Sequence, residues 1–253
     1  MAKQKKTSKK RKLSNTSKQK RRESLRRHLI ENLENRQLLT TFNVTTLDDR
    51  PDARPGDGYA RDIYGHTTLR SAITEANSQA GPHRINLPAG TYQLSIPGVG
   101  NDTNCSGDFD LHGDITLAGA GPGATRIQGN SLDRVLDITG NVSLQDLTVT
   151  GGRAPGPGQA GNGYGGGIRI SEGNVSLDNV VVSGNHGAFG TGGISNRGHL
   201  TINNSTLTGN STPYAAGALW VWGDGSASIT NSTISGNSAD NGGGIAADGN
   251  VLL

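Results

Sequence analysis

The sequence predicts an all-β fold, a solenoid in which short parallel strands stack coil on coil as a parallel β-helix. The first observation is a segment that reads Val175-Ser-Leu-Asp-Asn-Val-Val-Val-Ser-Gly-Asn185 and returns, with changes, at Val142–Gly152, Leu200–Asn210 and Ala227–Asn237. The second is a Gly-Gly-Ile phrase whose last residues, Ile168, Ile194, Leu219 and Ile245, are 25 or 26 positions apart. A fixed period in this range indicates repeats that bury their apolar side only against their neighbours.

Within each repeat the apolar residues alternate, as in Val175 and Leu177, which is the period of a strand. A further short strand is expected after each Gly-Gly, for example at Ile168–Ile170. Three short strands and three turns make one coil of about 25 residues. Leucine-rich repeats would need a Leu-rich consensus with a helical segment, and propeller blades would need roughly 40 residues or more.

Stacked coils place equivalent side chains about 4.8 Å apart, so identical residues form ladders. Asparagine recurs at two repeat positions, and we expect structural hydrogen-bonded columns there rather than catalytic groups: Asn179, Asn204 and Asn231 in one, Asn185, Asn210 and Asn237 in the other. Serine replaces Val180 in the later copies, at Ser205 and Ser232, which predicts a small polar stack inside the coil.

The net charge of +3 conceals a split between the two ends of the chain. Residues 1–40 hold fourteen Lys or Arg against three Glu, and the other 213 residues hold ten Arg against eighteen acids. The basic leader, residues 1–40, is therefore predicted to be disordered in its Lys/Arg-rich part. It shows no apolar signal core and no base-reading motif, so we expect no specific nucleic-acid binding. No transmembrane segment is predicted, and the single cysteine, Cys105, excludes an internal disulfide.

A short helix is predicted ahead of the coils. Leu69, Ala72, Ile73 and Ala76 fall on one helical face, with Thr67 or Thr68 as N-cap and Gly81-Pro82 as terminator. Such a helix covers the open end of the first coil. The first strands are then expected at 85–87 and 92–96.

Two segments resemble known proteins. His28–Thr40 resembles the Leu-Glu-Pro-Arg-x-Leu-Leu segment near the start of many planctomycete surface proteins, with Asn35 in place of the proline. That resemblance implies export, and the structural alternative is a short amphipathic helix. Thr67–Asn77 with Arg84–Leu94 resembles the Cys-Ser-Leu-Arg-Glu-Ala-Ile module that opens bacterial β-helix surface proteins, including ones grouped with polymorphic outer-membrane proteins. Thr67 stands at the module's cysteine. The resemblance implies a right-handed parallel β-helix of the pectin-lyase-like kind and says little about activity.

Right-handed β-helices include polysaccharide lyases and hydrolases, which need converging carboxylates beside a basic residue. The one acidic cluster is Asp102, Asp108, Asp110 and Asp114, with Asp133 and Asp137 a coil later. The candidates for metal binding among them are Asp108, Asp110 and Asp114. We interpret them mainly as solvated turn carboxylates, with calcium as the alternative and no other cofactor expected. No catalytic residue is assigned, and the protein is expected not to be an enzyme.

The alternation in Leu219-Trp-Val-Trp222 places Trp220 and Trp222 on the outside, with Arg197 on the neighbouring coil. Such a face binds sugar rings or a partner surface. The alternative is that the tryptophans pack under a loop such as Ser211–Tyr214.

The predicted organisation is a basic leader with an export-type motif at 1–40, a cap and first coils at 41–115, and shortened β-helix repeats at 116–253. The predicted role is a structural, adhesive, or polysaccharide- or partner-binding one at the cell surface or outside the cell. The rival is a carbohydrate-active β-helix enzyme. Because Asn250–Leu253 begins a strand without a cap after it, self-association through this end is also expected.

Overall fold

The computed structural model describes residue 20 and residues 39–156 and 163–253. The chain divides into two units, 1–38 and 39–253. Two predictions fall on residues 1–40: the disorder of the basic leader and the export-type motif. Apart from residues 20, 39 and 40, this segment lies outside the described residues.

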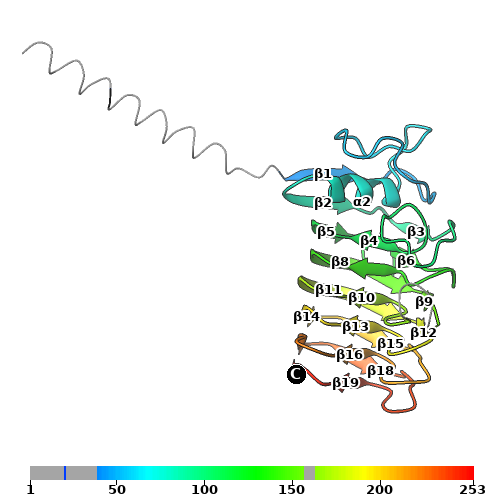
Figure 1. The fold of residues 1–253 in the computed structure, drawn as a ribbon, viewed down its shortest axis with the longest axis vertical. Helices are drawn as coiled ribbons and strands as arrows, with labels where there is room; N and C mark the ends of the chain where they lie inside the picture. Colours follow the sequence, from blue (N-terminus) through cyan, green and yellow to red (C-terminus); the bar gives the residue numbers. More distant parts are fainter. Residues whose placement is uncertain (1–19, 21–38, 157–162) are drawn as a thin grey trace, which may run out of the picture. The chain divides into compact units, whose positions relative to one another are not determined.

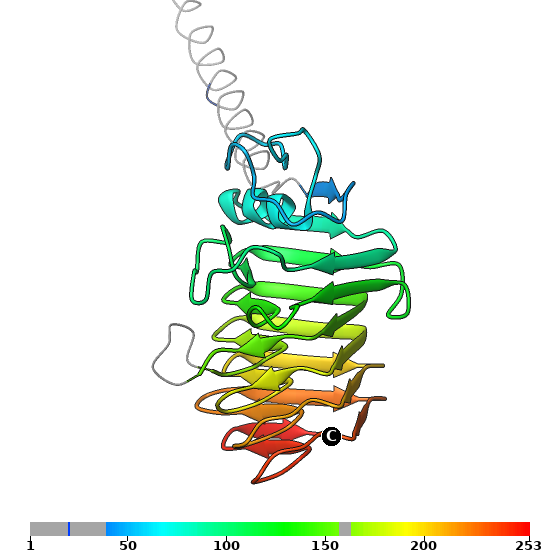
Figure 2. The ribbon, with the colours of Figure 1, turned by 90° about the vertical axis from the view of Figure 1, so that its right-hand side faces the viewer.

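Residues 39–253 form a parallel β-solenoid, in which every described pair of neighbouring strands runs parallel (Figures 1 and 2). Twelve strands belong to one sheet. Its main path is β1 (Thr40–Asn43), β2 (Pro82–Asn86), β5 (Asp114–Ala118), β8 (Asn141–Thr150), β11 (Asn174–Ser183), β14 (His199–Asn203), β17 (Ser226–Thr230) and β20 (Asn250–Leu252). Alongside lie β3 (Gly90–Gln93), β6 (Thr125–Gln128), β15 (Thr206–Thr208) and β18 (Thr233–Ser235).

A second sheet of six strands forms another side of the coils. In spatial order it contains β4 (Phe109–Leu111), β7 (Leu136–Ile138), β10 (Ile168–Ile170), β13 (Ile194–Asn196), β16 (Leu219–Val221) and β19 (Ile245–Ala247). A small sheet pairs β9 (Arg153–Ala154) with β12 (His186–Gly187). The predicted strand after each Gly-Gly phrase is therefore confirmed.

The strand register follows the sequence repeat. Ile168 pairs with Ile194, and Ile194 pairs with Leu219. Val175 likewise pairs with Leu200, its equivalent in the next copy. The inward side chains of these positions are all almost fully buried and form one continuous core along the stack. Each such aliphatic side chain contributes about 1.5–3 kcal/mol by its burial.

One asparagine column forms a corner of the coil. Asn179, Asn204 and Asn231, with Asp146 in the earliest copy, have φ between 48° and 55°, the left-handed region that asparagine and aspartate tolerate best after glycine. Asn179 donates from Nδ2 to the Oδ1 of Asp146 at 2.6 Å, so the side chains also bond between coils. The prediction of a structural turn column is confirmed.

The second asparagine column is an internal amide ladder. The backbone N–H and Nδ2 of Asn185 donate to Asn210 Oδ1 at 3.1 and 3.0 Å. Asn210 in turn donates through both groups to Asn237 Oδ1 at 3.0 Å. The expected serine stack is present as well, with Ser205 Oγ accepting from the Val180 backbone N–H at 3.0 Å.

The predicted helix is α2 (Leu69–Ser78), capped by Thr68 through a capping box with Ser71. It ends before the predicted terminator, because Gln79 already has an extended backbone and Pro82 begins β2. The helix packs against β2 and β4. Strand β1 was not predicted; it pairs with β2 and forms the edge strand of the main sheet.

The last coil contains β18, β19 and β20. Ile234, Ile245 and Val251 are only partly buried against the core, and Leu252 and Leu253 are exposed. Self-association at this end stays a prediction. No helix among the described residues is long and apolar enough to cross a membrane.

Candidate functional site

The outer face of the six-stranded sheet carries the residues with chemistry. In β4, β7, β10, β13 and β16 the middle residue points outward, because its neighbours on either side are buried. The strand register aligns these residues in one column, which reads Asp110, Asp137, Arg169, Ser195, Trp220 and Ala246 from β4 to β19. Charged groups occupy one end of this column and tryptophan lies toward the other.

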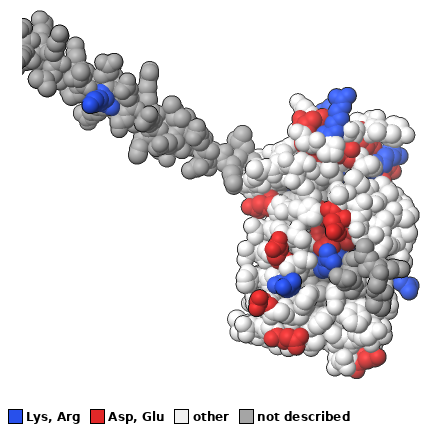
Figure 3. All heavy atoms as spheres, viewed as in Figure 1, with Lys and Arg blue, Asp and Glu red and all other residues white. Residues whose placement is uncertain are grey.

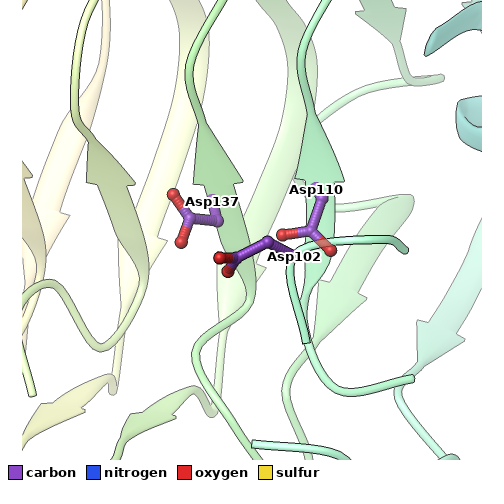
Figure 4. A group of neighbouring side chains, drawn as sticks. All are labelled: Asp102, Asp110 and Asp137. Atoms are coloured by element: carbon purple, nitrogen blue, oxygen red, sulfur yellow. The ribbon is translucent and has the colours of Figure 1, made fainter. Parts of the chain in front are cut away.

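The charged end is a cluster of carboxyl groups. Asp110 on β4 and Asp137 on β7 are register partners, and Asp102 approaches them from the loop before β4 (Figure 4). One oxygen of each carboxyl group lies within 4.8 Å of the others. Asp110 and Asp137 are buried, whereas Asp102 is exposed. The three side chains therefore meet at a point that solvent reaches from the Asp102 side.

Helix α2 holds the loop that carries Asp102. Arg70 is fully buried, pairs with Asp49, and donates to the carbonyl oxygen of Gly107 at 2.8 Å. Asn104 donates from Nδ2 to the Arg70 carbonyl oxygen at 3.0 Å. The backbone N–H of Asn104 donates to Asp110 Oδ2 at 2.8 Å, so the loop is fixed to the cluster itself.

Two arginines hold Asp137. Arg134 Nη1 lies 2.6 Å from Asp137 Oδ2. Arg169 makes a two-pronged contact, with Nη2 at 2.6 Å from Oδ2 and Nε at 3.0 Å from Oδ1. Such charge-assisted, bidentate pairs fix geometry as well as charge. Asp137 is therefore rigidly oriented toward Asp110.

Three buried aspartates in and beside this cluster have raised pKa values. Burial raises the pKa of Asp110 to about 7, helped by the neighbouring Asp137 and Asp102 carboxyl groups. Burial also raises the pKa of Asp108 well above its usual range, although Arg134 opposes the shift. The pKa of Asp133 is raised by burial in the same direction. Desolvation is thus the dominant cause at all three groups.

The structure separates the aspartates that the sequence grouped together. Asp108 is buried, and its Oδ2 lies 3.6 Å from Arg134 Nε. Asp108 is therefore an ion-pair partner of Arg134 and not one of the three carboxyl groups that converge. Asp110 is in the cluster, and Asp114 is exposed at the start of β5, outside the group that could hold a metal. The interpretation as solvated turn carboxylates does not hold for Asp108, Asp110, Asp133 and Asp137, because all four are buried.

The aromatic end of the column is a cluster of stacked rings. The rings of Trp220 and Trp222 stack with centroids 5.7 Å apart. Tyr164, from the segment before β10, stacks on Trp222 at 5.7 Å and lies 5.6 Å from Trp220. The exposed Arg197 guanidinium lies over the Trp222 ring at 5.3 Å. Trp220, Trp222 and Tyr164 are all half-buried.

The partner of the tryptophans is therefore Tyr164 rather than the 211–214 loop. Tyr214 packs instead on Phe189, at 4.5 Å, and Phe189 packs on Tyr164 at 5.4 Å. Trp222 Nε1 donates to Ser195 Oγ at 3.1 Å, which fixes its ring on the sheet. The contact of Tyr164 with the tryptophans was not predicted, because Tyr164 lies in a glycine-rich segment without periodicity. The one feature of the sequence that could have indicated it is a single large ring among glycines.

Charged side chains are few on the face that Figure 3 shows, and near its middle acidic and basic groups adjoin.

No protein-family model matches the chain, and a search of curated proteins found no relative.

Proposed function

We propose that this chain is a cell-surface or extracellular protein that binds a polysaccharide, or the glycan of a partner surface, along the outer face of its six-stranded sheet. The fold is proposed to be a right-handed β-helix of the pectin-lyase-like kind with about 25 residues per coil. The surface location rests on the resemblance to planctomycete surface proteins, including the segment at residues 28–40.

The observation that carries the binding role is the ring cluster with its arginine. Trp222 is fixed by its bond to Ser195 and half-exposed beside Arg197, so the platform is ordered before a ligand arrives. Rigid aromatic rings bind the apolar faces of sugars at low entropic cost, and an adjacent guanidinium donates hydrogen bonds to hydroxyl or carboxylate groups. Successive coils present outward positions about 4.8 Å apart, a spacing close to one sugar unit.

We expect Trp222→Ala to weaken polysaccharide binding about ten-fold, because a stacking contact contributes roughly 0.5–1.5 kcal/mol beyond its buried area. The measurement is a glycan-array screen of the full chain, followed by titration of the best ligand. Tyr59→Ala is the matched control, since Tyr59 is an exposed ring that carries Arg61 at 4.8 Å but lies in the 44–68 segment, outside the six-stranded sheet. Unchanged glycan binding by Trp222→Ala, or a large loss of stability, would refute the platform.

A second candidate function is carbohydrate cleavage, because the Asp102, Asp110 and Asp137 carboxyl groups converge beside Arg134 and Arg169. Their separation is near the roughly 5–5.5 Å between the two carboxyl groups of retaining hydrolases, and shorter than in inverting ones. The candidate predicts new reducing ends from the bound polysaccharide, with loss of this activity in Asp102→Asn and no loss in Asp114→Asn. Binding without any cleavage would leave the first proposal alone.

A further inference from the structure

We propose that Asp102, Asp110 and Asp137 bind a calcium ion at the charged end of the outward column. The three carboxyl groups come from two neighbouring strands and the loop that α2 holds in place. Calcium takes oxygen ligands at about 2.3–2.6 Å, so ligands on opposite sides of one ion lie about 5 Å apart. The three oxygens, which lie within 4.8 Å of one another, fit inside one such shell.

A second observation is a buried oxygen of Asp110 that has no partner. Only 1% of Asp110 is exposed, and its Oδ2 accepts from the Asn104 backbone N–H. Its Oδ1 is buried without any hydrogen bond. Figure 4 shows an oxygen of Asp110 directed toward Asp102 and Asp137. A buried carboxylate oxygen without a partner is costly, and a cation between the three groups supplies the missing interaction.

The charges of the surroundings also favour a cation. Five carboxyl groups, those of Asp102, Asp108, Asp110, Asp133 and Asp137, lie around the two guanidinium groups of Arg134 and Arg169. Asp137 Oδ2 accepts from both arginines, and its Oδ1 accepts from Arg169 Nε. A carboxylate offers about four acceptor positions, so Oδ1 retains one for an ion.

The same arginines limit the affinity. Their positive charge lies next to the ion, so we expect a dissociation constant of about 10⁻⁴–10⁻³ M, the range of extracellular calcium modules. Magnesium demands a near-ideal octahedron with short bonds. Asp110 and Asp137 are anchored by Asn104 and by two arginines and cannot rearrange to supply it. Calcium is therefore the expected ion.

The test is calorimetric titration of the chelator-treated full chain with CaCl₂, with MgCl₂ as comparison. We expect one site in the stated range, at least ten-fold tighter for calcium than for magnesium. Asp110→Asn and Asp102→Asn should each weaken calcium binding at least ten-fold, whereas Asp114→Asn, an exposed aspartate outside the cluster, should bind as the wild type does.

Asp102 is exposed, so its variant tests the site even where the buried Asp110 substitution prevents folding. No binding by the wild type, wild-type affinity in Asp102→Asn, or an equal loss in Asp114→Asn would each overturn the proposal. The outcome is independent of the glycan experiments, because Trp222→Ala is expected to leave the calcium titration unchanged.

Discussion

Replacing Asn210 by alanine is expected to destabilise the protein by roughly 3 kcal/mol, although the side chain is small. Asn210 is fully buried in the middle of the amide ladder. Its Oδ1 accepts from the backbone N–H and the Nδ2 of Asn185, and its Nδ2 donates to the Val182 carbonyl oxygen at 2.9 Å and to Asn237. The substitution leaves several of these buried groups unpaired, each at a cost of about 1–3 kcal/mol.

The measurement is the midpoint of denaturant unfolding, with hydrogen exchange of the Asn185 amide as a local readout. Asn174→Ala is the matched control: Asn174 also bonds an asparagine of the adjacent coil, Asn141, at 3.0 Å, but it is exposed. Water replaces the lost bond there, so the control should change stability by less than about 0.5 kcal/mol. Equal effects of the two substitutions would show that burial of the ladder is energetically unimportant.

Stability is expected to fall as the pH rises from 5 to 8, and Asp110 is one of the groups responsible. Burial raises its pKa from 3.8 to about 7 in the folded protein. A group whose pKa is raised on folding stabilises the folded state fully below its unfolded pKa and loses this effect as the pH passes its folded pKa. Between pH 5 and 8, with calcium removed by chelator, Asp110 alone should account for a decrease of about 2–3 kcal/mol.

Asp110→Asn isolates this effect, because an amide resembles the protonated carboxyl group and does not titrate. His186, whose pKa is lowered by burial, acts in the opposite direction, but it titrates equally in both proteins. The difference in unfolding free energy between wild type and Asp110→Asn should therefore change with pH by about 2–3 kcal/mol. The same pH dependence in both proteins would contradict the assignment.

The regular part of the fold was predictable because every copy of the repeat has the same local conformational preferences. Ile168 and Ile194 occupy equivalent places in the sequence and pair in the structure. Asparagine recurs at the position of Asn179, where the backbone adopts the left-handed conformation that closes the turn. The outward direction of Trp220 followed from the buried positions of Leu219 and Val221, since a strand alternates its faces.

The carboxyl cluster was less predictable, because the copy of the repeat that contains Asp110 departs from the pattern. The pairing of Asp110 with Asp137 depends on how the chain between them folds, and no sequence motif predicts that strand register. Asp102 joins them only because Arg70 and Asn104 hold its loop against the helix. The backbone N–H of Asn104, in the same loop, also donates to the buried Asp110 carboxyl group. These are tertiary effects, which short sequence patterns do not carry.

The internal asparagine ladder makes every junction between its coils chemically the same. Each coil presents an amide oxygen on one side and two N–H donors on the other, as Asn185, Asn210 and Asn237 show. Deleting or duplicating one whole repeat would thus bring together two surfaces that already match. In such a molecule, length changes by gene duplication without a new interface having to evolve, and each added unit extends the outward face by one row of side chains open to selection.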